Sequence, residues 1–293
     1  MNFSVIIPTH NRKDILPLTL RALEEQREYS HEYEVIIIDD GSHDGTREYL
    51  QTYNPKRPHC IKIYQQHNGP ACARNAGIKR ARGDTIVFIG DDTVPDQLFL
   101  SQHEQSHRRF ANSIVVGYTS WHPKCAVSPF MDFLDRSGLQ FSYNGLQEYQ
   151  EIDYNMFYTS NISVPREILQ TESFDEKFPY AAFEDIELGY RLYNKGVKSF
   201  YCPHAKCFHY HYYEDEKMIL ARQKQIAESL LYMISRHPEL EHTYIKKYRK
   251  LIEYAAIALC NPMTKCINKD LYWHAGMIKY KYKHLNALLS HKE

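Results

Sequence analysis

The fold of this chain is decided by residues 85–92, Thr85-Ile86-Val87-Phe88-Ile89-Gly90-Asp91-Asp92. The first five residues predict a strand that is buried on both faces of a sheet. Two adjacent carboxylates follow at once, and they must face a crevice because a buried strand cannot carry charge through its middle. Neighbouring carboxylates repel each other, so the pair indicates either a divalent-cation site or an acidic turn before the next helix. This segment alone favours neither.

Similar apolar runs alternate with amphipathic segments through the first 120 residues. The expected strands are 3–8, 34–39, 61–65, 85–89 and 113–116, and the expected helices are 14–26, 45–53, 71–82 and 96–110. Asp14 is expected to cap the first helix, and Pro17 suits its first turn. Continuous apolar strands separated by helices predict an α/β fold with a parallel sheet covered on both faces.

The later part of the chain has a less regular pattern. We expect strands at 157–164 and 199–201, the second ended by Pro203, and a helix at 186–195. Residues beyond 214 are predicted to be mostly helical, and they carry no evident chemistry.

Polar clusters follow three of the expected strands. They are Thr9-His10-Asn11-Arg12, Asp39-Asp40-Gly41-Ser42 and Gly90-Asp91-Asp92. Ligands of parallel sheets bind beyond the carboxyl ends of the strands. Three separate segments are therefore expected to meet at one edge, which favours a functional site over an acidic turn.

Composition excludes several classes of protein. The 293 residues contain 36 Lys plus Arg and 36 Asp plus Glu, so no basic field points to nucleic acid. No apolar run approaches the ~20 residues that span a bilayer. The seven cysteines form no CxxC pair, so we expect reduced thiols in a cytoplasmic protein. His103 and His107 have a spacing that can bind zinc, but no third ligand lies nearby, so we interpret them as structural.

Five motifs in a fixed order carry a resemblance to a known family. They are Val5–Arg12 (VIIPTHNR), Ile36–Thr46 (IIIDDGSHDGT), Gly69–Asp84 (GPACARNAGIKRARGD), the Asp91-Asp92 pair and Phe183–Leu192 (FEDIELGYRL). Together they closely resemble the inverting family 2 glycosyltransferases with a GT-A fold.

The resemblance covers about residues 1–212. It implies a Rossmann-like α/β/α sandwich with a mostly parallel central sheet. The implied domains are a glycosyltransferase domain at 1–213 and a C-terminal helical extension at 214–293. Within the first, residues 1–117 are the nucleotide-sugar-binding half and 118–213 the acceptor-binding and catalytic half.

The resemblance also implies a nucleotide-sugar donor, with UDP as the expected nucleotide. The implied donor-binding residues are Pro8, Thr9, His10, Asn11, Arg12, Asp40, Gly41, Ser42, Arg74, Asn75, Asp91 and Asn161. His10 can also be explained as a surface histidine in a turn, without a role in binding. Arg74 can likewise be explained as a solvated arginine on the surface of a helix.

The paired acids match the family's DxD metal motif, except that Gly90 stands at its first position. Asp92 is therefore the expected ligand of Mg²⁺ or Mn²⁺, with Asp91 on the ribose or a metal-bound water. His209 is the implied second ligand, with His211 on the same strand face. A histidine buried for structural reasons fits His209 equally well.

Glu184-Asp185 matches the family's base motif. The resemblance implies that Asp185 takes the proton from the acceptor hydroxyl, with Glu184 as the fallback. An Asp before Ile186 is also explained by capping of the helix N-terminus, and the two roles are compatible. The implied acceptor is a glycan or a lipid-linked glycan.

Two other functions stay open. A sugar-nucleotide pyrophosphorylase would share the architecture, but Thr9-His10-Asn11-Arg12 lacks the glycines that hold a triphosphate. A non-catalytic glycan- or nucleotide-sugar-binding protein on the same fold is the alternative that Gly90 keeps open. A homodimer and peripheral contact with the inner face of the membrane, through C-terminal residues such as 279–283, also stay open.

Overall fold

The computed structural model describes residues 2–212, 216–246 and 268–277. The chain divides into two compact units. Unit 1 holds residues 1–126, 138–176 and 185–211, and unit 2 holds 127–137, 177–184 and 212–293. The last segment of unit 2 begins at residue 212, near the predicted boundary at 213. Unit 2 also contains two short earlier segments, 127–137 and 177–184.

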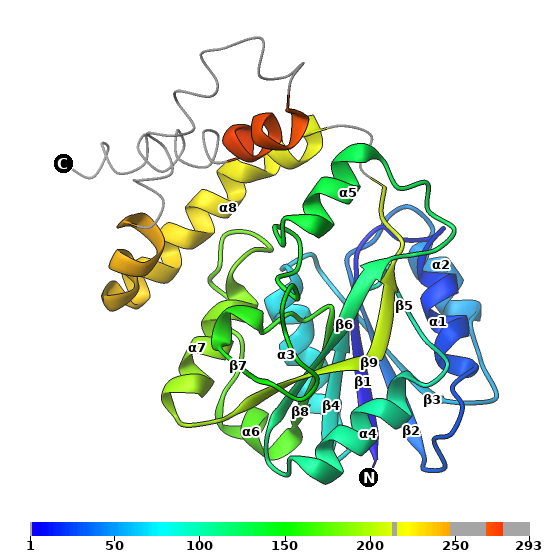
Figure 1. Ribbon diagram of the computed structural model, residues 1–293. Coiled ribbons are helices and arrows are strands. Elements are labelled where there is room, and N and C mark those ends of the chain that lie inside the picture. The colour runs from blue at the N-terminus through cyan, green and yellow to red at the C-terminus, as the bar shows by residue number, and fades with distance from the viewer. Residues whose placement is uncertain (1, 213–215, 247–267, 278–293) are drawn as a thin grey trace. The chain divides into compact units, whose positions relative to one another are not determined.

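Unit 1 is built on a nine-stranded sheet (Figure 1) in the order β3-β2-β1-β4-β8-β6-β9-β5, with β7 paired to β9. The bounds are β1 (Phe3–Thr9), β2 (Tyr33–Asp40), β3 (His59–Gln65), β4 (Thr85–Ile89), β5 (Thr93–Pro95), β6 (Ile114–Trp121), β7 (Glu151–Ile152), β8 (Asn161–Pro165) and β9 (Ser199–His209). Strands β1 to β4, β6 and β9 run in one direction, and β5, β7 and β8 run against them. The sheet is therefore mostly parallel, as predicted.

Helices cover both faces of this sheet. Along β1, Val5 and Ile7 join the core under α1 (Leu16–Glu24), α2 (Thr46–Thr52) and α4 (Phe99–Arg109). Ile6 points the other way, because successive strand residues alternate, and joins the core under α3 (Pro70–Arg80), α6 (Arg166–Thr171) and α7 (Glu184–Asn194). This is the predicted α/β/α sandwich.

Three local predictions were wrong. The strand expected at 157–164 begins only at Asn161, because residues 159 and 160 form a turn before it. Helix α1 begins at Leu16 after an Ile15 cap that makes no side-chain hydrogen bond, so Asp14 does not cap it. Strand β9 continues through Pro203 to His209, because a register shift against β6 places residues 203–205 in a bulge. A proline is tolerated there since no ladder N–H is needed.

In unit 2, α5 (Pro129–Arg136) is capped by Ser128, whose Oγ accepts a hydrogen bond from Met131 N at 3.2 Å. The Trp273 ring packs on Phe130 and Phe133, with ring centroids 5.3 and 5.5 Å apart. The other elements are α8 (Glu216–Arg236), the short 3₁₀ segments η1 (Tyr154–Met156, in unit 1) and η2 (Pro238–Leu240), and a π-helical turn η3 (His242–Lys246). Among the residues that the structure describes, no helix is long and apolar enough to cross a membrane. Residues 279–283 lie outside the described part.

Candidate active site

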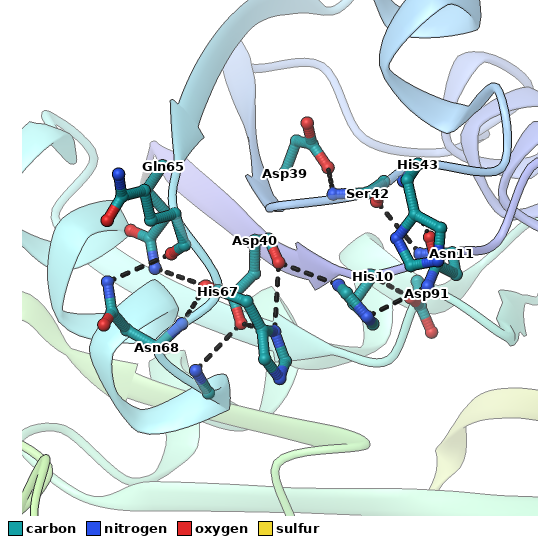
Figure 2. A network of polar contacts seen from close by, with 12 residues as sticks. His10, Asn11, Asp39, Asp40, Ser42, His43, Gln65, His67, Asn68 and Asp91 are labelled. Carbon is teal, nitrogen blue, oxygen red and sulfur yellow. Dashed lines mark hydrogen bonds and ion pairs between the residues drawn. The ribbon is translucent and has the colours of Figure 1, made fainter.

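The carboxyl ends of β1, β2 and β4 meet at one edge of the sheet. The backbone N–H of His10, just after β1, lies 3.4 Å from Asp91 Oδ2, just after β4. The His10 ring Nδ1 lies 2.8 Å from the carbonyl oxygen of Asp40 at the end of β2. The prediction that three polar clusters converge is confirmed (Figure 2). Pro8 and Thr9 end β1 at the same edge.

Asp40 fixes the loop that follows β3. Its Oδ1 accepts hydrogen bonds from Asn68 N at 2.9 Å and Gln65 Nε2 at 2.6 Å. Its Oδ2 accepts from Gly69 N at 2.9 Å and lies 2.9 Å from His67 Nδ1. Figure 2 shows these groups gathered around the carboxylate. Asp40 thus ties the entry of α3 to the end of β2.

Asp39 and Asn11 fasten the loop after β2. Asp39 is fully buried, and its two oxygens accept from Ser42 N at 3.0 Å and Arg47 Nε at 2.7 Å. Asn11 N donates to Ser42 Oγ at 2.9 Å, and Asn11 Oδ1 accepts from His43 N at 2.9 Å. The loops after β1 and β2 therefore hold each other in place.

Gly41 and the His10 ring leave little space between these loops. A Cβ at Gly41, which has a φ of +77°, would lie 2.7 Å from His67 N. The His67 ring lies on the His10 ring with centroids 4.2 Å apart and an interplanar angle of 33°. The His67 side chain is 60% exposed, so a flat aromatic surface faces solvent beside Asp40.

Basic side chains surround the acidic pair. Arg12 lies 3.4 Å from Asp91 Oδ1 and 3.9 Å from Asp92 Oδ2. His209 Nε2 lies 3.2 Å from Asp92 Oδ1, and His211 Nδ1 lies 3.8 Å from Asp92 Oδ2. The predicted residues Arg12 and His209 are thus brought onto the acids directly.

The two acids are electrostatically different. Burial, and then the charge of Asp92, raise the pKa of Asp91 to about 6. Burial alone would raise the pKa of Asp92 as well, but His209, Arg12 and His211 together lower it to about 2. Asp92 is therefore the carboxylate that stays charged.

Gly90 makes room for this arrangement. A Cβ at this position would lie 2.7 Å from Thr93 Oγ1 and 3.0 Å from Asp92 Oδ1. An aspartate in the first position of the motif would therefore need both groups to move.

The donor atoms near Asp92 fit a divalent cation only in part. Within residues 2–212, 216–246 and 268–277, no group of three or more His, Cys, Asp or Glu side chains is arranged to hold a metal ion. Asp92 and His209 nevertheless supply one oxygen and one nitrogen close together, and His209 Nδ1 is buried without a hydrogen-bond partner in the described residues. Mg²⁺ and Mn²⁺ sites are often completed by substrate phosphates and water, so two protein donors fit that kind of site.

Asp185 is positioned at the start of α7. Its Oδ1 accepts from Ile186 N at 2.8 Å, and its Oδ2 lies 3.4 Å from both N and Oγ1 of Thr159. The carboxylate is half-buried, whereas the neighbouring Glu184 is only 4% exposed. Of the two predicted bases, Asp185 is the more accessible.

Arg74 and Asn75 lie farther along α3. Asn75 is buried and exchanges hydrogen bonds with the Phe174 backbone, at 2.9 and 3.0 Å, and with Glu176 Oε1 at 2.8 Å. The Arg74 guanidinium lies 5.4 Å from the centre of the Phe174 ring. These contacts attach the 174–176 segment to α3, which is a structural role for Asn75.

The position of Asn161 does not fit its predicted role in donor binding. The side chain is fully buried at the start of β8. Its amide nitrogen donates to Tyr118 O and Ala205 O, and its oxygen lies 3.0 Å from His103 Nε2. Every polar atom is thus used inside the protein, so we leave Asn161 out of the donor site.

Sequence reasoning missed the segment Gln65 to Asn68 and the ring of Trp121, which stacks on His209 with centroids 5.7 Å apart. Gln65 to Asn68 follow an expected strand in the same way as the three clusters that were recognised. The rule that found those clusters would therefore have found this fourth one.

Comparison with known proteins agrees with this geometry. The family described as "Glycosyl transferase family 2" matches residues 4–170. The chain belongs to this family. Among curated relatives, the uncharacterized glycosyltransferase YfnE of Bacillus subtilis is 28% identical over 242 residues, covering 67% of this chain and 62% of YfnE.

Validoxylamine A glucosyltransferase of Streptomyces hygroscopicus subsp. limoneus is 29% identical over 219 residues, covering 66% of this chain and 48% of that protein. The family 2 chain described here therefore spans about half to three-fifths of the length of these two relatives.

Solved structures share the fold at low identity. S. aureus TarS 1–349 in complex with UDP has a TM-score of 0.59 at 16% identity, covering 99% of this chain and 92% of that one. The mannosyltransferase PcManGT from Pyrobaculum calidifontis, in complex with GDP-Man and Mn²⁺, has a TM-score of 0.61 at 15% identity, covering 96% and 86%. The expected GT-A fold is confirmed.

Proposed function

We propose that this family 2 protein is an inverting glycosyltransferase that moves a sugar from a nucleotide-sugar donor to a glycan or lipid-linked glycan acceptor. The observation that carries the proposal is the meeting of His10, Asp40, Asp91 and Asp92 at one sheet edge, with His209 Nε2 3.2 Å from Asp92. That edge is where parallel α/β sheets bind their ligands.

The nucleotide base is proposed to lie against the His10 and His67 rings. Two imidazoles 4.2 Å apart beside a carboxylate offer a stacking surface and a hydrogen-bond acceptor. UDP is the proposed nucleotide, supported by the UDP complex of TarS, and GDP is the alternative suggested by the GDP-Man complex of PcManGT.

Asp92 and His209 are proposed to hold Mn²⁺ or Mg²⁺ together with the donor diphosphate. When bound, such an ion stabilises the charge on the departing nucleoside diphosphate. Arg12 lies against the same acids, and it is proposed to contact the diphosphate oxygens.

Asp185 is proposed as the general base. It takes the proton of the acceptor hydroxyl while that oxygen attacks the anomeric carbon from the face opposite the diphosphate, so the configuration inverts. Ile186 N and Thr159 orient the carboxylate for this step.

The test measures UDP release across a panel of donors and acceptors, with and without EDTA. We expect turnover that EDTA abolishes and that Asp92→Asn removes, whereas Asp96→Asn, a neighbouring acid that only caps a turn through Leu98 N, retains it. Turnover that is insensitive to EDTA would refute the metal role. Donor binding without any turnover would instead favour a non-catalytic nucleotide-sugar-binding protein.

A further inference from the structure

A bulge divides β9 into two halves. Gly117 of β6 pairs with Cys202, but the next residue, Tyr118, pairs with Lys206. The half after the bulge runs to His209, which pairs with Thr93 of β5. The size of the bulge therefore decides which residue of β9 lies beside Asp92.

The Asn161 side chain clamps this bulge. Its amide nitrogen donates at 3.0 Å to Tyr118 O, where the register shifts, and at 2.8 Å to Ala205 O, the last residue of the bulge. A Cβ at Gly117 would lie 2.3 Å from Asn161 Oδ1 and 2.4 Å from Ala205 O. The absence of a side chain at Gly117 therefore leaves the space that the Asn161 amide occupies between β6 and β9.

The clamp is held by a buried chain of hydrogen bonds whose direction is determined. Both amide hydrogens of Asn161 are used, so its oxygen must accept from His103 Nε2. Neutral His103 then accepts at Nδ1 from the Ser163 hydroxyl at 2.8 Å, and Ser163 Oγ must accept from His107 Nε2 at 2.7 Å. Burial lowers the pKa of His103 to about 3 and that of His107 to about 4, which keeps both rings neutral.

We propose that Asn161 is a positioning residue, which fixes the second half of β9 through Tyr118 O and Ala205 O and so presents His209 to Asp92. The link from Asn161 to metal binding rests on the proposed function, in which His209 is a metal ligand. His103, Ser163 and His107 act only by orienting the Asn161 amide.

The first test needs no substrate. Trp121 stacks on His209, and the chain has two tryptophans, so Trp273→Phe leaves Trp121 as the only tryptophan, which is excited selectively at wavelengths where the 24 tyrosines do not absorb. In that background, Asn161→Asp is isosteric but turns a carboxylate oxygen toward two carbonyl oxygens. We expect the acrylamide quenching of Trp121 to differ from that of the Trp273→Phe parent, because Trp121 lies against His209.

Ser4→Ala is the matched control. Ser4 is also fully buried and hydrogen-bonded on both sides, to Glu34 Oε1 at 2.7 Å and Gly83 N at 2.8 Å, but at the amino end of β1. It should lose stability without changing the quenching. If Asn161→Asp does not fold, Asn161→Ser, which cannot reach both carbonyls, takes its place.

The second test titrates Mn²⁺ in the presence of UDP. Disturbing a residue that orients a metal ligand typically costs about 10–100-fold in metal affinity, and we expect a loss in this range for Asn161→Asp. In a His209→Ala background the same change should cost less than about twofold, because the coupled partner is gone. A loss of equal size in both backgrounds, or unchanged quenching and affinity in folded Asn161→Asp, would overturn the proposal. A wild-type protein that binds no Mn²⁺ refutes the metal role alone, and the Trp121 measurement then decides the positioning role.

Discussion

Replacing Asp40 by Asn tests the account of the edge of the sheet most directly. The carboxylate accepts from backbone N–H groups on both oxygens, Asn68 N on Oδ1 and Gly69 N on Oδ2, each at 2.9 Å. An amide has one oxygen, so either orientation turns its NH₂ group toward a backbone N–H. One charge-assisted hydrogen bond is lost, and a partly buried N–H group is left without an acceptor.

The magnitude follows from those two losses. A hydrogen bond to a charged group contributes about 1.5–3 kcal/mol, and the partly buried donor left unpaired adds a smaller cost, so Asp40→Asn should lose about 3 kcal/mol of unfolding free energy. The pairing with His67 adds little because that side chain is 60% exposed. For a unit of this size the loss corresponds to a fall in Tm of about 6–12 °C.

The assay is thermal and urea unfolding, followed by UDP binding. Asp96→Asn is the matched control, because Asp96 Oδ1 accepts one backbone hydrogen bond, from Leu98 N at 3.0 Å, which an amide oxygen can replace. Asp40→Asn should also weaken UDP binding, since His67 is displaced from His10. An Asp40→Asn protein within about 1 kcal/mol of wild type would show that the loop is held by other contacts.

Three further outcomes are expected. Asp185→Asn should lower sugar transfer by about 10²–10⁴-fold while UDP affinity by calorimetry stays unchanged; transfer at the wild-type rate would exclude it as the base. His107 keeps a folded-state pKa of about 4 against an unfolded value of about 6.5, so the unfolded state binds the extra proton and stability falls as pH drops through this window. Relative to wild type, His107→Gln should reduce the loss of unfolding free energy between pH 7.5 and 5.5 by about 1.4 kcal/mol in urea titrations, and an unchanged pH dependence would refute the assignment. Gly90→Ala should displace the Asp92 carboxylate and weaken Mn²⁺ binding about 10-fold in the presence of UDP, an effect that calorimetry would detect.

The sequence predicted the strands of unit 1 best where burial on both faces leaves a continuous apolar run. The run 85–89 matches β4 without error, and the runs 3–8 and 34–39 match β1 and β2 to within one residue at each end. Because β1, β2 and β4 are parallel neighbours, the polar clusters that follow them lie together. The alternation of apolar runs and helices in the sequence was therefore enough to predict which edge of the sheet holds these clusters. Pro203 misled the prediction of β9, because the bulge removes the need for a backbone N–H at this position.

Single-residue roles were harder to predict than the place of the site. Asn161 lies at the start of β8, and its side chain is on the face of the sheet that α4 covers, on the same side as Ser163 two residues later. The pair meets His103 and His107, which share one face of α4. The spacing of two residues along β8 and of four residues along α4 can both be seen in the sequence. Only the packing of α4 on this face of the sheet shows that the two spacings bring these side chains into contact.

The counter-charges around Asp92 have a consequence for how ligands bind. A cation that reaches Asp92 must compete with the Arg12 guanidinium, which already lies 3.9 Å from Asp92 Oδ2 and 3.4 Å from Asp91 Oδ1. A diphosphate gives Arg12 a new anionic partner and so lowers the cost of releasing the carboxylate. Cation and nucleotide are therefore expected to bind as a thermodynamically linked pair, each raising the affinity for the other by the same factor. The protein would then rarely hold a free metal ion, and the site would assemble only when the donor arrives.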